Sequence, residues 1–181
     1  CDPNNDPSGG TLLVNAGKTR VAGIDLSAGI SPVAGLSFNA AASFLDLKSR
    51  ALTVPDFLVG YLASDEVPFN LVPKTTVSAG VRWTLPVPEN ITDAVFSADY
   101  YHSSSVRSSD AVLPAYDLVN ARLDLNDLGG SGLDLGFFVR NVFDKDYLAS
   151  SNVGSRALGI LSGFYGAPRT YGVDVRFRFG E

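Results

Sequence analysis

Seven segments of the chain alternate between apolar and polar residues, and this alternation restricts the fold more than any other feature. In the last of them, residues 172–179, every second residue is Val or Phe, and the residues between them are Gly, Asp or Arg. Side chains alternate between the two faces of a β-strand, so each segment is predicted to be a strand with one apolar and one polar face. The segments are 22–30, 36–44, 75–85, 94–102, 115–125, 133–143 and 172–179, and residues 11–14 resemble the start of an eighth.

A water-soluble β-sandwich and a membrane β-barrel both contain strands of this kind. Strand length favours the barrel, because the segments run to roughly nine to twelve residues and strands of soluble proteins usually have five or six. The connections also alternate between short ones (31–35, 86–93 and 126–132) and long ones (45–73, 103–114 and 144–167). Short turns at one rim and long loops at the other are typical of an outer-membrane barrel, whose apolar face contacts lipid.

Charged residues follow the polar side of the alternation. An arginine on the lipid side of a barrel costs about 2–4 kcal/mol near the bilayer midplane. The arginines predicted for the polar face are Arg82, Arg122, Arg140, Arg176 and Arg178. The carboxylates predicted for the same face are Asp99, Asp124, Asp134 and Asp174. We therefore expect a network of ion pairs inside the barrel.

A membrane-spanning helix is not predicted. The longest stretch without charge, residues 26–45, is long enough to span a bilayer. Serine, asparagine, glycine and proline interrupt it, and it alternates on both sides of a turn at 31–35. The chain is therefore predicted to be all-β.

Composition excludes several function classes. The net charge of −5 argues against nucleic acid as the main partner. One Cys and one His cannot build the usual Cys/His zinc site, and no metal or cofactor site is predicted. A chain that begins with Cys1 and contains no Met is expected to be processed or to be a fragment of a longer protein.

Aromatic residues gather near the predicted strand ends. Two groups are expected to form aromatic girdles at the membrane interfaces. The group at the outer rim is Tyr100, Tyr101, Tyr116, Tyr165 and Tyr171, and the group at the inner rim is Trp83, Phe177 and Phe179.

The C-terminal sequence carries a family resemblance. Residues 139–147 read Val-Arg-Asn-Val-Phe-Asp-Lys-Asp-Tyr, and residues 165–172 read Tyr-Gly-Ala-Pro-Arg-Thr-Tyr-Gly before the alternating end. This order resembles the C-terminus of TonB-dependent receptors. Residues 113–119 resemble the strand that precedes it, and residues 15–25 resemble a strand start found further upstream. The resemblance covers nearly the whole chain.

The resemblance implies a 22-stranded transmembrane β-barrel filled by an N-terminal plug. We expect residues 1–181 to be the C-terminal portion of that barrel, with seven to eight antiparallel strands and without the plug or the energy-coupling box. The implied function is import of a scarce ligand, most often a ferric siderophore, across the bacterial outer membrane, and no enzyme activity is implied. The implied partners are outer-membrane lipid, lipopolysaccharide, the TonB system acting through the plug, and the barrel assembly machinery.

The chain end also resembles the assembly signal of this family, a pattern formed by Thr170, Gly172, Val175, Phe177 and Phe179. Its physical role would be to dock an exposed edge strand onto the assembly machinery by strand addition. The sequence departs from the family where Gly180 and Glu181 follow the last aromatic residue.

Ligand contacts are expected in the long loops, although no single residue stands out. The candidate aromatic residues are Phe57, Tyr61, Phe69, Tyr147 and Phe164, and the alternative is that they pack on one another.

Two other functions remain open at this point. One is an independent small outer-membrane barrel, structural or lipase-like, because His102 and Ser104 would point the same way on a strand. The Asn-Gly that flanks such a pair in outer-membrane lipases is missing here, and no orienting partner is evident, so a polar strand end is favoured. The other is a soluble β-sandwich that acts as a binding module.

Overall fold

The computed structural model describes residues 19–49, 71–88, 91–108, 111–152 and 162–178. The chain divides into two compact units, residues 1–21 with 47–68 and residues 22–46 with 69–181, and the account below concerns the second. Eleven strands lie in the described residues. They are β1 (Thr19–Val33), β2 (Leu36–Ser49), β3 (Thr75–Leu85), β4 (Ile91–Ser103), β5 (Val106–Ser108), β6 (Ala111–Leu113), β7 (Tyr116–Leu128), β8 (Leu133–Arg140), β9 (Leu148–Asn152), β10 (Ser162–Tyr165) and β11 (Thr170–Phe177).

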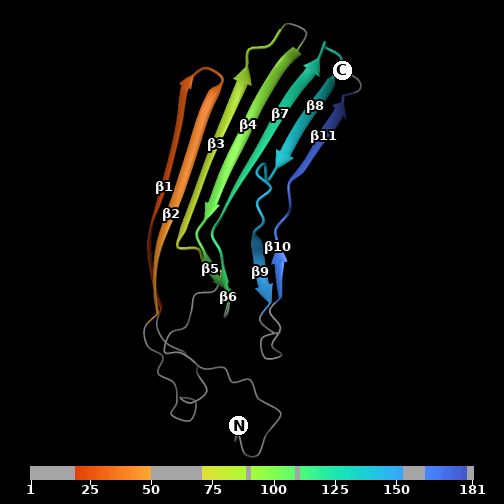
Figure 1. The fold of residues 1–181 in the computed structure, drawn as a ribbon. Helices are drawn as coiled ribbons and strands as arrows, with labels where there is room; N and C mark the ends of the chain where they lie inside the picture. Colours follow the sequence, from red (N-terminus) through yellow and green to blue (C-terminus); the bar gives the residue numbers. More distant parts are fainter. Residues whose placement is uncertain (1–18, 50–70, 89–90, 109–110, 153–161, 179–181) are drawn as a thin grey trace, which may run out of the picture. The chain divides into compact units, whose positions relative to one another are not determined.

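The main sheet has seven strands in the order β1-β2-β3-β4-β7-β8-β11, which is also their order along the chain (Figure 1). From β2 to β11 the neighbouring strands pair in the antiparallel sense. The strands β5 and β6 form a hairpin within the connection from β4 to β7, and β9 and β10 form another within the connection from β8 to β11. The prediction of an all-β, antiparallel sheet is therefore confirmed.

The two ends of the sheet carry different connections. The β1–β2, β3–β4 and β7–β8 connections are short and lie at one end, at the top of Figure 1, whereas the β4–β7 and β8–β11 connections are long and lie at the other. The β1–β2 turn depends on Gly35, whose φ of 78° is in the left-handed region that favours glycine. This arrangement confirms the predicted short-turn rim and long-loop rim.

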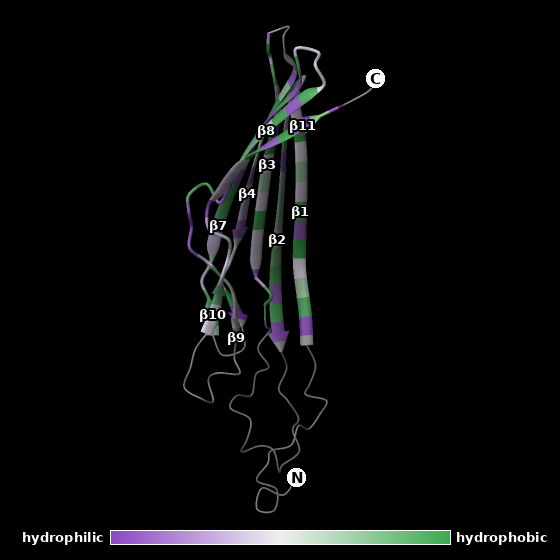
Figure 2. Ribbon diagram, turned by 90° about the vertical axis from the view of Figure 1, so that its right-hand side faces the viewer, coloured by the Kyte–Doolittle hydropathy of each residue, from purple (hydrophilic) through white to green (hydrophobic). Residues whose placement is uncertain are grey.

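The strand register gives the sheet its two faces. One row of register partners crosses five strands as Phe38, Val81, Ala98, Ala121 and Val139. Because the side-chain period of a strand is two, a slip of one residue would move this row to the other face. The register thus confirms the faces predicted from the alternation, and the hydropathy colours alternate along β1 and β2 (Figure 2).

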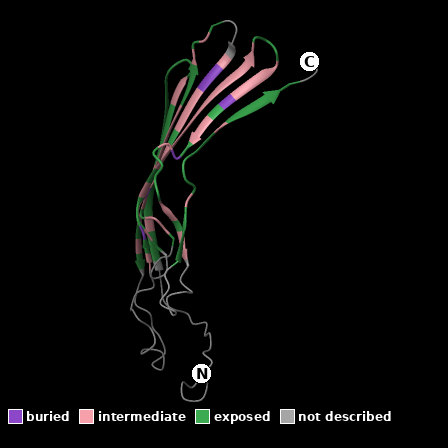
Figure 3. Ribbon diagram, turned by 45° about the vertical axis from the view of Figure 1, so that its right-hand side comes forward, coloured by how far each residue is buried: buried purple, intermediate pink, exposed green. Residues whose placement is uncertain are grey.

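No second layer covers the apolar face in the described residues of this unit. Val173 is 56% exposed and Val175 is 67% exposed. Within the described residues the buried hydrophobic side chains are only those of Ala94, Val95 and Leu113 (Figure 3). A soluble sandwich buries such a face in its core. The described structure therefore does not support the sandwich interpretation.

Some element boundaries differ from the prediction. Strand β8 ends at Arg140, not at residue 143, because Asn141 has a φ of 51° and begins a turn. The short strands β5, β6, β9 and β10 were not predicted. Residues 11–14 lie outside the described residues. No helix in the described part of the chain is long and apolar enough to cross a membrane.

Candidate functional site

A charged cluster lies on the polar face where β7, β8 and β11 run side by side. The Nε atom of Arg122 donates to Asp124 Oδ1 over 2.8 Å, and its Nη1 atom donates to Asp174 Oδ2 over 2.6 Å. Arg122 and Asp124 are two residues apart on β7, whereas Asp174 is on β11. The arginine therefore links two strands that are separated by β8.

Gly136 makes this link possible. It lies on β8 as the register partner of both Asp124 and Asp174. A Cβ atom at this position would collide with Nη2 of Arg122 and would lie 3.0 Å from Asp124 Oδ1. The missing side chain lets the guanidinium cross β8 close to the backbone. A hollow of about 420 Å³ borders this cluster, and Asp134 and Arg176 also line it.

Further ionic and polar contacts extend the cluster along the polar face. Nη2 of Arg178 donates to Asp134 Oδ1 over 2.8 Å, and the side-chain amide of Asn120 donates to Asp99 Oδ2 over 2.7 Å. The guanidinium of Arg140 instead lies 5.6 Å from the ring centre of Phe138, at cation–π distance.

The expected ion-pair network is therefore confirmed for Arg122 and Arg178. Arg82 and Arg176 share the polar face without an ion pair inside the described residues.

The turn after β8 is built around the side chain of Asn141, which is 5% exposed. Its Nδ2 atom donates to the carbonyl oxygens of Lys145 (3.0 Å) and Ala167 (3.1 Å), and its Oδ1 atom accepts from the Lys145 amide over 2.8 Å. The Asn141 amide donates to Asn120 Oδ1 over 3.0 Å. One asparagine thus joins β7, the turn and the segment that leads into β11.

Three tyrosines form a stack at the long-loop end of the polar face. The rings of Tyr116 and Tyr147 are stacked with centres 4.6 Å apart, and those of Tyr101 and Tyr116 lie 6.1 Å apart. Tyr147 lies against Gly166, whose amide donates to the Tyr147 carbonyl over 2.8 Å. Glycine is required there because a Cβ atom would collide with the ring.

This stack corrects the predicted outer girdle in part. In the register of β4 on β7, Tyr101 is the partner of Leu118, and Tyr116 is the partner of Ser103. Tyr101 and Ser103 are two and four residues after Asp99, so they lie on the same polar face as Asp99, and so does Tyr116. Tyr100 and Tyr171 lie on the apolar face, as a girdle requires. The sequence pattern was sufficient to assign Tyr100 and Tyr101 to different faces, because adjacent residues of a strand point to opposite sides of the sheet.

The predicted loop aromatics are brought together only in part. Tyr147 joins the tyrosine stack, whereas Phe164 is 64% exposed on β10. Phe57, Tyr61 and Phe69 lie outside the described residues.

The contacts of His102 and Ser104 in the described residues agree with the favoured interpretation of a polar strand end. The Ser104 hydroxyl accepts a hydrogen bond from the Thr75 amide over 3.1 Å, and no hydrogen bond joins it to His102 in the described part of the chain. The sequence alone assigned no orienting partner to His102, and in the structure its Nδ1 atom lies 2.8 Å from Asp117 Oδ1. Within the part of the chain that the structure describes, the histidine and carboxylate therefore meet without a serine hydroxyl hydrogen-bonded to the imidazole.

Comparison with known proteins decides the family. The model of the TonB dependent receptor-like β-barrel family matches residues 1–142. The chain belongs to the TonB-dependent receptor β-barrel family. No curated protein sequence matches it. Its described sheet is a partial barrel that does not close.

Solved structures of two receptors share this fold. BauA, the ferric preacinetobactin receptor of Acinetobacter baumannii, is 22% identical, has a TM-score of 0.61, and is matched over 90% of this chain and 22% of its own. PiuA, a siderophore receptor of the same organism, is 15% identical, has a TM-score of 0.64, and is matched over 88% of this chain and 22% of its own. This segment of a TonB-dependent receptor barrel thus spans about a fifth of each receptor.

Proposed function

We propose that the chain is part of the barrel wall of a bacterial outer-membrane receptor that imports a ferric siderophore with energy delivered through TonB. Residues 1–181 would be the C-terminal portion of that barrel, and the plug would lie outside them. The family match over residues 1–142 carries this proposal. The likeness of the fold to two siderophore receptors supports the ligand class.

The proposed membrane location is supported by the exposed apolar face. Side chains such as Ile24, Leu26 and Ile30 are about 60% exposed on β1 (62%, 58% and 64%). Contact with lipid keeps such an apolar face out of water, and closure of the barrel gives the backbone groups of every strand a hydrogen-bond partner. In this proposal outer-membrane lipid and lipopolysaccharide contact the apolar face, and the polar face lines the lumen.

We assign plug contact to the polar face around Arg122, Asp124 and Asp174. The cluster borders an open hollow and is half-exposed, so its charges remain accessible to a lumenal partner. Reversing both charges, as Arg122→Asp with Asp124→Arg, should weaken plug retention and ligand uptake. Unchanged retention and uptake would show that this cluster only stabilises the wall.

We assign ligand contact to the tyrosine stack of Tyr101, Tyr116 and Tyr147. The stack lies on the polar face at the long-loop end, where a ligand would reach the lumen from outside. Aromatic surfaces give large contact area at a low entropy cost. Tyr116→Ala should weaken siderophore binding, and Tyr171→Ala, on the apolar face, is the matched control.

Strand β11 is proposed to dock onto the barrel assembly machinery. It is at one end of the strand order and contains Thr170, Gly172, Val175 and Phe177, whereas Phe179 lies outside the described residues. An edge strand offers unpaired backbone groups for strand addition. Phe177→Asp should therefore reduce the amount of protein in the outer membrane.

The deciding experiment is deletion of the gene, followed by growth on iron-limited medium with single ferric siderophores. We expect loss of growth on at least one siderophore and its restoration by the complete gene, with the protein recovered in the outer-membrane fraction. Growth that is unaffected on every siderophore would refute the ligand class. Recovery of the protein outside the outer membrane would refute the receptor assignment itself.

The proposal contains no catalytic step. His102 and Asp117 lie together, but the Ser104 hydroxyl is bound to a backbone amide. The independent lipase-like barrel therefore has no structural support in the described residues. The matching family and the two similar solved structures are receptors.

A further inference from the structure

A hollow of about 260 Å³ opens on the polar face over β1, β2, β3 and β4. Thr76 lies near the start of β3 and Tyr101 near the end of β4, so the hollow is toward the long-loop rim. Asp25 lines it from β1 and Tyr101 from β4. The polar-face side chains between these two are small, and they are Ser27, Ala41, Ser43, Thr76 and Ser78.

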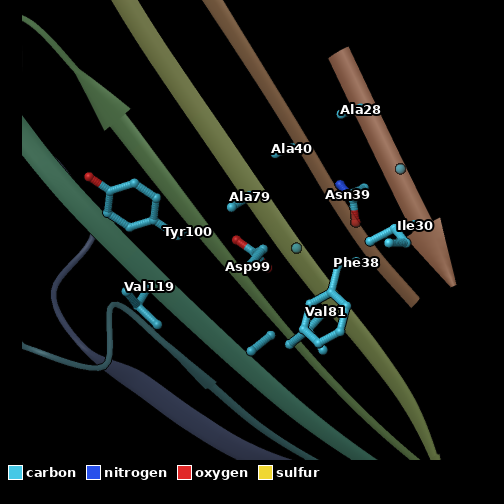
Figure 4. Close-up of a pocket in the computed structure, with 13 residues that line it drawn as sticks. Ala28, Ile30, Phe38, Asn39, Ala40, Ala79, Val81, Asp99, Tyr100 and Val119 are labelled. Atoms are coloured by element: carbon cyan, nitrogen blue, oxygen red, sulfur yellow. The ribbon is translucent and has the colours of Figure 1, made fainter. Parts of the chain in front are cut away.

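The two faces of these strands offer different chemistry. The apolar face carries a groove of about 500 Å³ lined by methyl groups such as those of Ala40 and Ala79 (Figure 4). On the polar face, Ser78 is the register partner of both Ala41 and Tyr101 and lies in the middle of the hollow. Hydroxyl groups stand there where the apolar groove has methyl groups, so the hollow can hydrogen-bond an occupant.

The polar groups of the hollow are free to bind an occupant. Asp25 is exposed and forms no ion pair with any other residue that the structure describes. No lysine or arginine is among the described residues that line the hollow. Asp99, two residues before Tyr101, adds a second negative charge about 7 Å away along the same face. The hollow is therefore negatively charged and lacks a cation of its own.

An ammonium group matches these features. It has one positive charge, three N–H donors and no acceptor. The Asp25 carboxylate can accept one of these donors in a charge-assisted hydrogen bond, and the serine hydroxyls around it can accept the others. The ring of Tyr101 offers a cation–π contact at the side of the hollow. A carboxylate or phosphate group would instead meet the charge of Asp25 without a compensating cation.

We infer that this hollow binds a protonated primary amine carried by the ferric siderophore. The inference rests on the proposed function and narrows it to siderophores that have a free amine. Tyr101 belongs both to the hollow and to the tyrosine stack, where its ring centre lies 6.1 Å from that of Tyr116. A single ligand therefore reaches both, with the body of the chelate on the stack and the amine beside Asp25.

Ferrioxamine B and its N-acetyl derivative are a matched pair of probes. Both hold iron through the same hydroxamate groups, and they differ only in whether the terminal amine is free. The test measures equilibrium binding of each chelate to the complete receptor, purified from the outer membrane in detergent, by quenching of intrinsic fluorescence. We expect ferrioxamine B to bind about tenfold more tightly than the acetylated chelate, as for one charge-assisted contact.

Asp25→Asn removes the charge and keeps the size of the side chain. It should bring the two affinities to within about twofold of each other, mainly by weakening binding of ferrioxamine B. A preference caused by the bulk of the acetyl group would survive this substitution. Asp117→Asn is the matched control, because Asp117 lies on the apolar face as the register partner of His102, and this variant should keep the full preference.

Ser78→Leu fills the hollow and should also remove the preference, because the amine no longer reaches Asp25. Ser37→Leu is its control. Ser37 lies on the polar face of β2 but outside the hollow, so this variant should bind both chelates like the wild type. Ser43→Leu repeats the test if Ser78→Leu fails to fold, as judged by heat-modifiable migration on gels.

Equal binding of the two chelates by the wild type would overturn the inference, and so would binding of neither. A preference that survives Asp25→Asn would do the same. If Ser78→Leu releases the plug and leaves chelate binding unaltered, the hollow holds the plug and the amine assignment is wrong. Wild-type protein recovered outside the outer membrane would instead refute the proposed function.

Discussion

Three glycines on the polar face of the described sheet each lie beneath a polar or aromatic side chain from the neighbouring strand. Gly136 lies under Arg122, and the other two pairs are Gly80 under Asn39 and Gly172 under Phe138. A Cβ atom at Gly80 would lie 2.6 Å from Asn39 Oδ1, and a Cβ atom at Gly172 would lie 2.7 Å from the Phe138 ring. Glycine thus allows long side chains to lie flat on the sheet, so they need not project from it.

Gly136→Ala should move the Arg122 guanidinium off β8 and break its contact with Asp174. The pair is half-exposed, so we expect a loss of only about 1 kcal/mol in the free energy of unfolding. The measurement is urea-induced unfolding in detergent micelles. Gly29→Ala is the control, because a Cβ atom there meets only an ordinary contact at 3.7 Å. Equal stability of the two variants would mean that the close passage over β8 is not needed.

The partners of Arg122 illustrate what sequence reasoning can reach. The alternation placed Arg122, Asp124 and Asp174 on one face, and all three do meet. Their pairing was out of reach, because Asp174 is 52 residues away and is brought close by the register of β7 on β8 and of β8 on β11. Gly136 carries no side-chain signal of its own, so its role is visible only in the structure.

Turns and short hairpins were less predictable than long strands. The period-two pattern predicted all seven strands of the main sheet, because each has one apolar face over at least eight residues. It could not give β5 or β6, which have three residues each and are too short to show a period. It also ran past Arg140, because the end of β8 is set by hydrogen bonds between the Asn141 side chain and backbone groups, which Asn141 Nδ2 donates and Asn141 Oδ1 accepts.

Asn141→Ala should destabilise the turn after β8 more than any exposed polar substitution. It removes three side-chain hydrogen bonds, leaves part-buried backbone groups of Lys145 and Ala167 without these partners, and puts Ala at a φ of 51°. We expect a loss of about 3 kcal/mol or more in unfolding free energy. Faster amide hydrogen exchange across residues 141–152 would locate the effect. Asn126→Ala, which removes one 3.3 Å bond to Asp93, should change exchange little, and equal effects would contradict the turn's special role.

The whole sheet presents an apolar surface that nothing in the described residues covers. Large side chains such as Ile30 (64%) and Val175 (67%) would be an aggregation hazard in water. In a membrane the same exposure is favourable, and the polar side chains on the reverse face are kept away from lipid. The two faces therefore predict opposite responses to an added charge.

Ala40→Arg and Ala41→Arg test this contrast with one residue type in one strand. Ala40 pairs with Ala79 on the apolar face, and Ala41 pairs with Ser78 on the polar face. We expect Ala40→Arg to lower the unfolding free energy in phospholipid vesicles by about 2–4 kcal/mol, the cost of arginine facing lipid. Ala41→Arg should change it by less than about 0.5 kcal/mol. The reverse order would show that the polar face meets the membrane.

The β5–β6 and β9–β10 hairpins have their own hydrogen-bond ladders, separate from that of the main sheet. Their pairing therefore imposes no register on β4, β7, β8 or β11. These hairpins could be lengthened, shortened or exchanged while the main sheet keeps its geometry. Recombination between related genes at the ends of β4 and β7 would be a simple route to such exchange.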